Sequence, residues 1–340
     1  MAGARVAVIG ATGLVGREIV GMLAERRFPI GELHLYASER SAGEEVELGD
    51  QTVRVERLGR ELPPLDVVFL CTPAEVARDV GEDLAAEGAL VIDLSTASRS
   101  DPAAPLLVAG ASPEELSLGA DRGIVVAVPD PLALLVAAVL RPLATLVRLR
   151  RVAVTALESA SVFGAKAVEG LARASAALLS GVDVDEQIAV HSALAFSCAP
   201  EKPAEGAIDP VSRDLRRLLG SDVAVQVVRI RVPAFHGNAV SLSVAADSPL
   251  SLEAVREQLR EAPSILLDDP EGEVTASRDA VGTDAVHVGA VHLHPEDPSW
   301  VSIWAASDNL RQGGALNAVA LAEALLRARQ PGGGEPCGSA

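Results

Sequence analysis

Lysine, cysteine and long apolar runs are scarce in this chain of 340 residues, and each scarcity narrows what the protein can do. Only Lys166 and Lys202 are lysines, and 47 acidic residues outnumber 29 basic ones, so the formal net charge is −18. Because such a charge repels phosphate backbones and anionic lipids, we expect neither nucleic acid nor a membrane as a partner. No stretch approaches the roughly 20 apolar residues that a membrane-spanning helix needs.

The three cysteines, Cys71, Cys198 and Cys337, and the six histidines form no cluster with metal-ligand spacing. We therefore expect no metal site, and the small number of thiols is typical of a reducing compartment. Because residues 1–5 lead directly into a strand-like run, we also expect no signal peptide and a cytoplasmic protein.

Residue periodicity predicts two domains, for which the chain is long enough. The first region alternates short apolar runs with helical patterns, which is typical of a doubly wound parallel sheet of the α/β class. The predicted strands are Arg5–Ile9, Glu32–Ala37, Asp66–Cys71, Ala89–Asp93 and Ile124–Val128. The predicted helices are Leu14–Glu25, Pro73–Ala86 and Leu132–Leu140.

After Leu143 the strand-like runs become longer and the helices fewer, which predicts an α+β domain around a mixed or mostly antiparallel sheet. Its predicted strands are Arg151–Ser161, Val223–Val232, Asn238–Ala245, Ala285–His294 and Trp300–Ser307. Its predicted helices are Lys166–Leu179, Val211–Leu218 and Leu252–Glu261. A final amphipathic helix is expected over Gly313–Arg329, and the Gly/Pro-rich residues 331–340 predict a flexible tail.

A glycine-rich turn follows the apolar run Val6–Ile9 and opens the first helical pattern. Its glycines permit a tight turn and a close approach of the backbone, and the helix N-terminus directs unpaired N–H groups at a pyrophosphate. This is the context of a Rossmann-type dinucleotide site. The residues expected to contact the cofactor are Gly10, Thr12, Gly13, Leu14, Val15 and Gly16.

The second predicted strand ends in Ser38-Glu39-Arg40-Ser41, where a Rossmann-type fold meets the adenosine ribose. An acidic residue there favours a free ribose hydroxyl, whereas an arginine with hydroxyl neighbours favours a 2′-phosphate. We interpret Arg40, Ser38 and Ser41 as a 2′-phosphate site and expect NADP. Glu39 leaves NAD as the alternative cofactor, and a solvated polar loop is the alternative to any binding role.

Five segments occur in an order and at a spacing that extend over nearly the whole chain. They are Gly10–Gly16, Ala37–Gly43, Val91–Arg99, Arg231–Pro233 and Ser307–Ala318. In these segments the chain resembles the aspartate-semialdehyde dehydrogenase family. The resemblance implies an NADP-binding domain over residues 1–130 with 309–330 packing back, a catalytic-like and dimerisation domain over 131–308, and a homodimer.

The chemistry that the resemblance implies is reversible reductive dephosphorylation of an acyl phosphate through a thioester. It needs a cysteine thiolate and a nearby base. Aligned on Arg141-Pro142-Leu143, the position of the family's cysteine is Pro131. Counted from Arg231, the position of its histidine is Asn238, which cannot titrate. Pro131 fits the first turn of a helix, with Asp130 as its N-cap.

Other positions that the resemblance places in the family's substrate pocket agree with the family only in part. Arg99 and Arg231 match the family's anion-binding arginines and are candidates for holding a small anionic metabolite, with a structural salt bridge as the alternative for each. Val162 and Phe163 place bulk where the family has small residues. The acidic-x-Lys element of the family is missing from Ile208–Val211.

We therefore hypothesise an NADP-binding homodimer that is inactive in the thioester reaction. The alternative is an active NADP-dependent oxidoreductase of aldehydes or acyl phosphates with altered catalytic residues, for which Ser161 and His236 are the candidate proton donors. Cys71 and Cys198 are the remaining candidates for a nucleophile, although a buried structural role is the simpler interpretation of Cys71.

Overall fold

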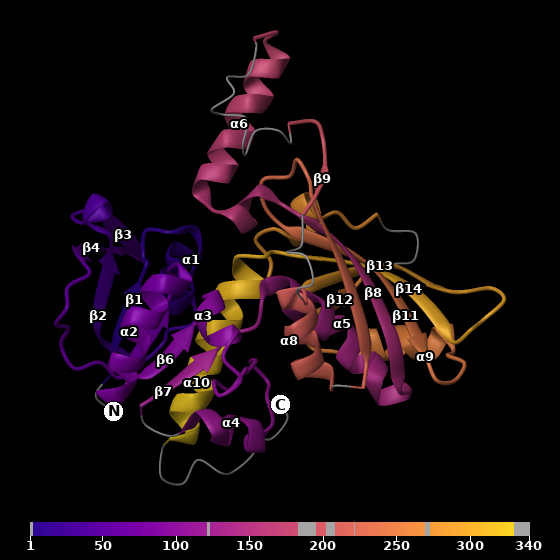
Figure 1. The fold of residues 1–340 in the computed structure, drawn as a ribbon, viewed down its shortest axis with the longest axis horizontal. Coiled ribbons are helices and arrows are strands. Elements are labelled where there is room, and N and C mark those ends of the chain that lie inside the picture. The colour runs from indigo at the N-terminus through magenta and orange to yellow at the C-terminus, as the bar shows by residue number, and fades with distance from the viewer. Residues whose placement is uncertain are drawn as a thin grey trace. The chain divides into compact units, whose positions relative to one another are not determined.

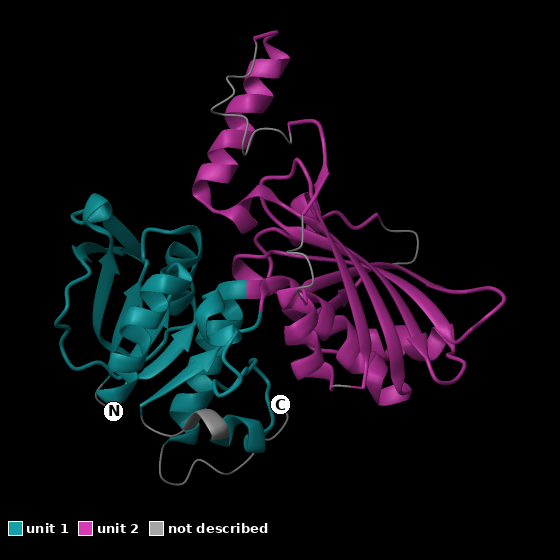
Figure 2. Ribbon diagram, viewed as in Figure 1, with its two compact units in different colours: residues 1–129, 314–340 teal, residues 130–313 magenta. Residues whose placement is uncertain are grey.

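The computed structural model describes residues 3–120, 123–182, 195–201, 208–220, 222–268 and 273–329. The chain forms two compact units, Met1–Pro129 with Gly314–Ala340 as unit 1 and Asp130–Gly313 as unit 2 (Figures 1 and 2). Each unit contains a seven-stranded sheet. Among the helices that the structure describes, none combines the length and the hydropathy needed to cross a membrane.

The sheet of unit 1 has the strand order β3-β4-β2-β1-β5-β6-β7 and is parallel except for the β3–β4 pair. This confirms the predicted doubly wound sheet. The β3–β4 hairpin was not predicted, because its few apolar residues alternate with charged ones. The strands are β1 (Ala4–Ile9), β2 (Ile30–Ala37), β3 (Glu45–Leu48), β4 (Gln51–Arg57), β5 (Val67–Leu70), β6 (Leu90–Asp93) and β7 (Ile124–Ala127).

Successive side chains of the central strands of unit 1 face opposite sides of the sheet, and both sides are buried. Ala7, Ile9 and Val68 belong to the cluster that packs against α2 (Ala74–Ala86). The chain end returns to this unit as α10 (Asn317–Ala328), where Glu323 accepts hydrogen bonds of 3.0 and 2.6 Å from the Arg26 guanidinium. The other helices of unit 1 are α1 (Leu14–Glu25), α3 (Thr96–Arg99) and α4 (Pro113–Ala120).

The sheet of unit 2 is mixed, with the order β12-β13-β14-β11-β8-β10-β9, which confirms the predicted α+β architecture. Strands β8 and β10 are parallel, whereas β8, β11, β14 and β13 run antiparallel in turn. The strands are β8 (Leu149–Glu158), β9 (Ala199–Pro200), β10 (Ala224–Arg231), β11 (Asn238–Ala246), β12 (Ile265–Leu267), β13 (Val286–Leu293) and β14 (Trp300–Ser307).

One face of this sheet forms the core of unit 2. Val154 and Leu242 lie side by side on it and are buried against the helices. The helices of unit 2 are α5 (Pro131–Leu146), α6 (Ala165–Leu179), α8 (Pro210–Leu219) and α9 (Leu252–Glu261). On the opposite face Ala153 and Thr155 are exposed, so the strands alternate as expected for a sheet with one open side.

Two helix boundaries differ from the sequence prediction. Helix α5 continues past Pro142 to Leu146, although proline contributes no N–H to the helix. The final helix is preceded by a π-helical turn, η4 (Arg311–Leu316), before α10 begins. The predicted flexible tail, residues 331–340, lies outside the described residues, as do Lys202 and Cys337.

Candidate cofactor and catalytic sites

The glycine-rich turn joins β1 to α1 in unit 1. Gly10 has a φ of +90°, and a Cβ on it would lie 2.3 Å from the carbonyl oxygen of Cys71. A Cβ on Gly16 would lie 2.2 Å from the carbonyl oxygen of Gly10. Both positions therefore require glycine. Gly13 precedes α1, and within the described part of the chain no side chain caps this helix, which leaves its first N–H groups available to an anion.

The loop after β2 brings Ser38, Arg40 and Ser41 together in the short helix η1 (Glu39–Ser41) and the residue before it. Arg57 of β4 neutralises Glu39 at 3.4 Å. Arg40 is exposed, and among the described residues no acid pairs with its guanidinium. The loop therefore has an exposed cation between two serines in the sequence, of which Ser38 is exposed and Ser41 is buried, and an exposed arginine of this kind suits a phosphate.

The carboxyl end of β5 lies against the same turn and supplies a residue that the sequence did not indicate. The Oγ1 atom of Thr72 is buried and has no hydrogen-bond partner among the described residues, and its methyl group would lie 3.2 Å from a Cβ on Gly10. A buried hydroxyl without a partner, next to a backbone cradle that a side chain would fill, fits a bound dinucleotide. Cys71 precedes it, and burial, reinforced by the charge of Asp93, raises the pKa of its thiol, so the reactive thiolate is disfavoured.

Arg99 is held by its own loop. Its Nε atom donates to the carbonyl oxygen of Ser95 at 2.9 Å and its Nη2 atom to that of Leu94 at 2.6 Å. The loop is itself organised by Asp93, which is 1% exposed and accepts hydrogen bonds from Ser95 and Ser98. Arg99 lies in unit 1, whereas Arg231 lies in unit 2.

The residue to which the resemblance assigns the family's nucleophile, Pro131, is the first residue of α5. Asp130 caps this helix by accepting the Leu132 N–H at 3.0 Å, and its own N–H donates to Asp214 at 2.9 Å. Pro131 follows at a position where its missing N–H is not needed. A Cβ on Gly313 would lie 2.8 Å from the Cβ of Pro131, so the proline ring packs directly against that backbone.

The residue to which the resemblance assigns the family's base, Asn238, is the first residue of β11. Asn238 is 2% exposed, and its Oδ1 atom accepts the Ser159 N–H at 3.3 Å. Beside it, Asn309 accepts the Gly237 N–H at 3.0 Å and the Ser161 hydroxyl at 3.1 Å. The side chains at this position and around it are neutral hydrogen-bonding groups, and an amide there transfers no proton.

Two arginines on β10 have different surroundings. Arg229 donates two hydrogen bonds of 2.8 Å to Glu158, which is 1% exposed, and burial raises the pKa of this carboxyl while the guanidinium opposes that shift. Arg231 has its guanidinium carbon 5.9 Å from the centre of the Phe163 ring, and its Nε lies 3.4 Å from Glu201. Phe163, which was predicted to fill the site, thus packs against a candidate substrate arginine.

The remaining candidates are His236, Cys198 and Ser161. His236 is half-buried in the loop before β11, Cys198 is exposed beside β9, and Ser161 belongs to the Asn309 network. Among the described residues no group of three or more metal-ligating side chains occurs. The sequence analysis also missed the Glu158–Arg229 pair, for which the only signal was a charged residue at the end of each predicted strand.

Two family models match this chain. The family described as "Semialdehyde dehydrogenase, NAD binding domain" matches residues 5–118, and "Semialdehyde dehydrogenase, dimerisation domain" matches residues 140–312. The chain is 31% identical over 336 residues to an aspartate-semialdehyde dehydrogenase from Aquifex aeolicus, covering 96% of this chain and 98% of that protein. The chain belongs to the aspartate-semialdehyde dehydrogenase family.

Other members of the family match as extensively. A protein named USG-1 protein homolog from Azotobacter vinelandii is 34% identical over 329 residues, covering 95% of this chain and 97% of that protein. The crystal structure of aspartate semialdehyde dehydrogenase II from Vibrio cholerae aligns with a TM-score of 0.90 at 30% identity, covering 96% of this chain and 99% of that one. The resemblance found in the sequence, and the fold that it implied, are confirmed.

The buried ion pair of β8 and β10 yields a stability prediction. Arg229→Met leaves the Glu158 carboxylate buried without its partner, so we expect the free energy of unfolding of unit 2 to fall by about 3–5 kcal/mol. The double variant Glu158→Met/Arg229→Met is expected to regain most of this loss. Urea unfolding followed by circular dichroism measures both, and a single variant within about 0.5 kcal/mol of the parent, the range of ordinary surface changes, would refute the role given to the pair.

Proposed function

We propose that this chain is an NADP-binding homodimer of the aspartate-semialdehyde dehydrogenase family that does not catalyse the family's thioester reaction. The observation that carries the proposal is the start of α5, where Pro131 occupies the position that the sequence alignment gives to the nucleophile. A proline ring has neither a thiol nor a hydroxyl, and no rotation of its neighbours supplies one.

The surroundings of Pro131 support a structural role. Asp130 is committed to capping α5 and is tied to Asp214, and the ring of Pro131 lies against the Gly313 backbone. Asn238 supports the same proposal from the position assigned to the base, because its amide is buried in a hydrogen-bonded network. Neither proton transfer nor nucleophilic attack has a side chain to perform it at these positions.

Unit 1 is proposed to retain the cofactor site. The turn Gly10–Gly16, including Thr12, Leu14 and Val15, would hold the pyrophosphate, and Ser38, Arg40 and Ser41 would hold a 2′-phosphate. When bound, NADP would supply the hydride acceptor of a dehydrogenase. This chain's contribution is the backbone cradle, the unpaired Thr72 hydroxyl and the exposed Arg40 cation.

Arg99 and Arg231 are each proposed as a binding group for a small anionic metabolite. They differ in the contacts that their guanidinium groups already make. Arg231 offers a guanidinium that is 29% exposed and pairs with Glu201 only at 3.4 Å. Arg99 already donates to two backbone carbonyls, so an anion would have to compete with these acceptors. A phosphate or carboxylate is the class of ligand that such groups select.

The open face of the unit 2 sheet supports the proposal of a homodimer. On it lie Thr155 and Ser241, which are neighbours in adjacent strands and are both exposed, with Val228 and Trp304 next to them along the same row. Because the face consists of small and apolar side chains, its burial against the same face of a second copy across a two-fold axis is favoured over its exposure to water. The matched family segment, residues 140–312, is named for dimerisation and contains this face.

An activity assay tests the proposed loss of chemistry. We expect the purified protein to form no NADPH from aspartate semialdehyde and NADP, with either phosphate or arsenate present, under conditions in which an active family member turns over. Turnover by the parent protein that Cys71→Ser abolishes would overturn the proposal and identify Cys71 as the nucleophile. Turnover that survives in Cys71→Ser and is lost in His236→Ala would instead establish an oxidoreductase with altered residues.

A binding experiment tests the cofactor site separately. Arg40→Ala is expected to raise the Kd for NADPH about 10- to 100-fold, because a hydrogen bond to a charged group contributes about 1.5–3 kcal/mol. The Kd for NADH should stay unchanged, as should NADPH binding by Arg78→Ala, an exposed arginine on α2. Fluorescence titration measures each constant. Equal losses for NADPH and NADH in Arg40→Ala would contradict a 2′-phosphate site.

The molar mass in solution tests the proposed homodimer. Light scattering of the parent protein at micromolar concentration is expected to give twice the chain mass of 35.0 kDa. Thr155→Arg places a charge on the open sheet face and is expected to give monomers, whereas Thr52→Arg, at an exposed site on β4 of unit 1, should leave the mass unchanged. A monomeric parent protein, or a Thr155→Arg variant that remains dimeric, would contradict this interface.

A further inference from the structure

A cavity of 320 Å³ lies on unit 2, away from the residues at the start of α5 and β11. Its walls are Arg256 and Arg260 from α9, Asp268 from the end of β12, and the segment Gly289–Val291 of β13. Its volume is within the lower part of the range of sites that hold small molecules. None of its wall residues takes part in the cofactor or catalytic positions described above.

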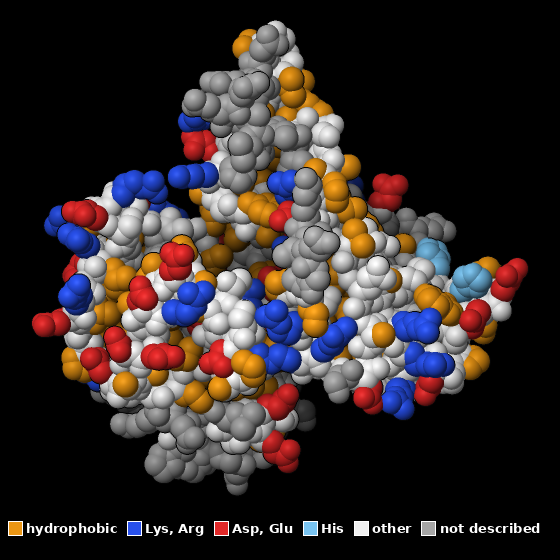
Figure 3. Space-filling model, in the orientation of Figure 1, with side chains coloured by type: hydrophobic (Ala, Val, Ile, Leu, Met, Phe, Trp, Pro, Cys, Tyr) orange, Lys and Arg blue, Asp and Glu red, His pale blue; other side chains and the backbone are white. Residues whose placement is uncertain are grey.

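The two arginines of the cavity, Arg256 and Arg260, are two positive charges on one helix. They are one turn apart on the same face of α9, a spacing at which like charges repel and destabilise the helix. Among the described residues neither guanidinium has an ion-pair or hydrogen-bond partner. Figure 3 shows that basic and acidic side chains are interspersed over the visible face of the molecule. A pair of this kind at a cavity wall favours an anionic ligand that bridges it.

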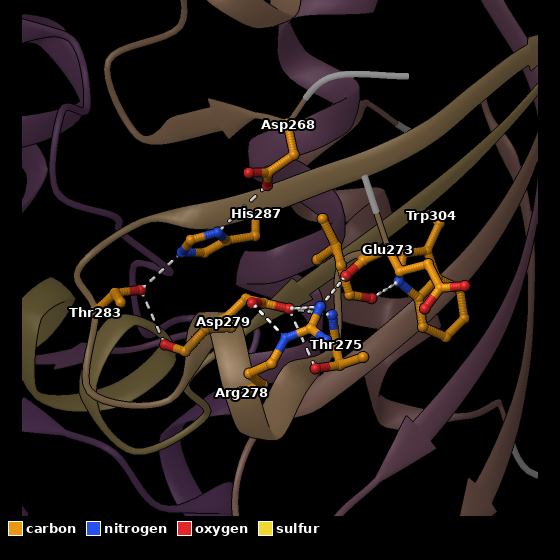
Figure 4. A network of polar contacts seen from close by, with 10 residues as sticks. Asp268, Glu273, Thr275, Arg278, Asp279, Thr283, His287 and Trp304 are labelled. Atoms are coloured by element: carbon orange, nitrogen blue, oxygen red, sulfur yellow. Dashed lines mark hydrogen bonds and ion pairs between the residues drawn. The ribbon is translucent and has the colours of Figure 1, made fainter. Parts of the chain in front are cut away.

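The opposite charge in the cavity comes from Asp268. One of its oxygens lies 3.4 Å from Nδ1 of His287, as Figure 4 shows, and the side chain is 41% exposed. His287 is positioned in turn by Thr283, whose hydroxyl lies 3.1 Å from Nε2 and donates to the Ala280 carbonyl at 2.9 Å. Within the described part of the chain neither Oδ2 of Asp268 nor Nδ1 of His287 has a hydrogen-bond partner, so this carboxylate is left for a cationic group of a ligand.

The floor of the cavity is the segment Gly289–Val291 of β13, in which Gly289 and Val291 are buried and Ala290 is half-buried. The last ladder contact of β12 is the hydrogen bond of 2.9 Å from the Asp268 N–H to the Val288 carbonyl. Beyond it β13 continues, and the register with β14 shifts between Gly289 and Val291, which makes Ala290 the extra residue of a bulge. Bulges of this kind occur next to binding sites.

We propose that this cavity binds an α-amino acid with an acidic side chain. Two carboxylates pair with Arg256 and Arg260, and the ammonium group pairs with Asp268. The net charge of −1 on such a ligand matches the net +1 of the three side chains, and the signs are separated in the same way. A plain dicarboxylate leaves Asp268 facing an anion, and a neutral amino acid leaves one arginine without a counter-charge.

Isothermal titration of the full-length protein tests the proposal with four probes. L-aspartate and L-glutamate carry both carboxylates and the ammonium, succinate lacks the ammonium, and L-alanine lacks the second carboxylate. We expect saturable binding of at least one of the two acidic amino acids, and weaker binding of succinate and L-alanine. Succinate that binds as tightly as the acidic amino acids would replace the proposal with a simple anion site, and absence of binding by all four would refute it.

Variants assign the binding to this cavity. Arg256→Gln/Arg260→Gln is expected to weaken the acidic amino acid by more than about tenfold, the loss that corresponds to one charge-assisted hydrogen bond. Asp268→Asn should weaken the amino acid but not succinate, and Arg216→Gln, at an exposed site on α8, should change neither. Binding that all variants retain would overturn the proposal. Urea unfolding followed by circular dichroism shows whether each variant is folded, so this outcome stays separate from that of the cofactor proposal.

Discussion

The first turn of α5 is the constraint on which unit 2 depends. The Asp214 carboxylate accepts the Asp130 N–H, Asp130 caps the helix, and Pro131 starts it against the Gly313 backbone. The helix that follows is buried over most of its length and forms the centre of the unit 2 core, with Leu132, Leu135 and Leu140 fully enclosed. Asp130 and Pro131, to which the proposed function assigns the position of the family's nucleophile, thus make the contacts of a helix start.

The two units differ in whether backbone or side-chain atoms meet the requirements of their sites. In unit 1 the requirements of a dinucleotide site are met by the backbone itself, since Gly10 and Gly16 admit no side chain and α1 has an uncapped N-terminus in the described part of the chain. In unit 2 the requirements of catalysis are side-chain requirements, and there Pro131 and Asn238 belong to helix-start and amide contacts. A fold can therefore be preserved while the chemistry at its site is replaced, because the two rest on different atoms.

Much of the architecture was predictable because periodicity reports burial. The strands and helices of unit 1 follow apolar runs such as Val67–Leu70, which are buried on both faces, and the predicted bounds agree with the structure to within a few residues. The β3–β4 hairpin was not predicted, because its strands are largely exposed and carry alternating charges.

The candidate site was less accessible to sequence reasoning. The glycines and the helix start at Asp130 follow from local rules, but the unpaired Thr72 hydroxyl and the Glu158–Arg229 pair depend on contacts between strands. Partners 71 positions apart in the chain leave no local signal. The cavity of α9 has the same origin, since Asp268 and Arg256 meet only through the packing of β12 beside that helix.

The most direct test of the central claim is a crystal structure of the protein with NADP and an anion bound. The account predicts an ordered dinucleotide on the Gly10–Gly16 turn and a nicotinamide C4 with no cysteine sulfur and no histidine nitrogen positioned beside it for attack or proton transfer. Pro131 should be the residue of α5 at that place. A thiol and a base that converge there, with the sulfur about 3–3.5 Å from a bound substrate carbon, would contradict the account and restore the thioester chemistry.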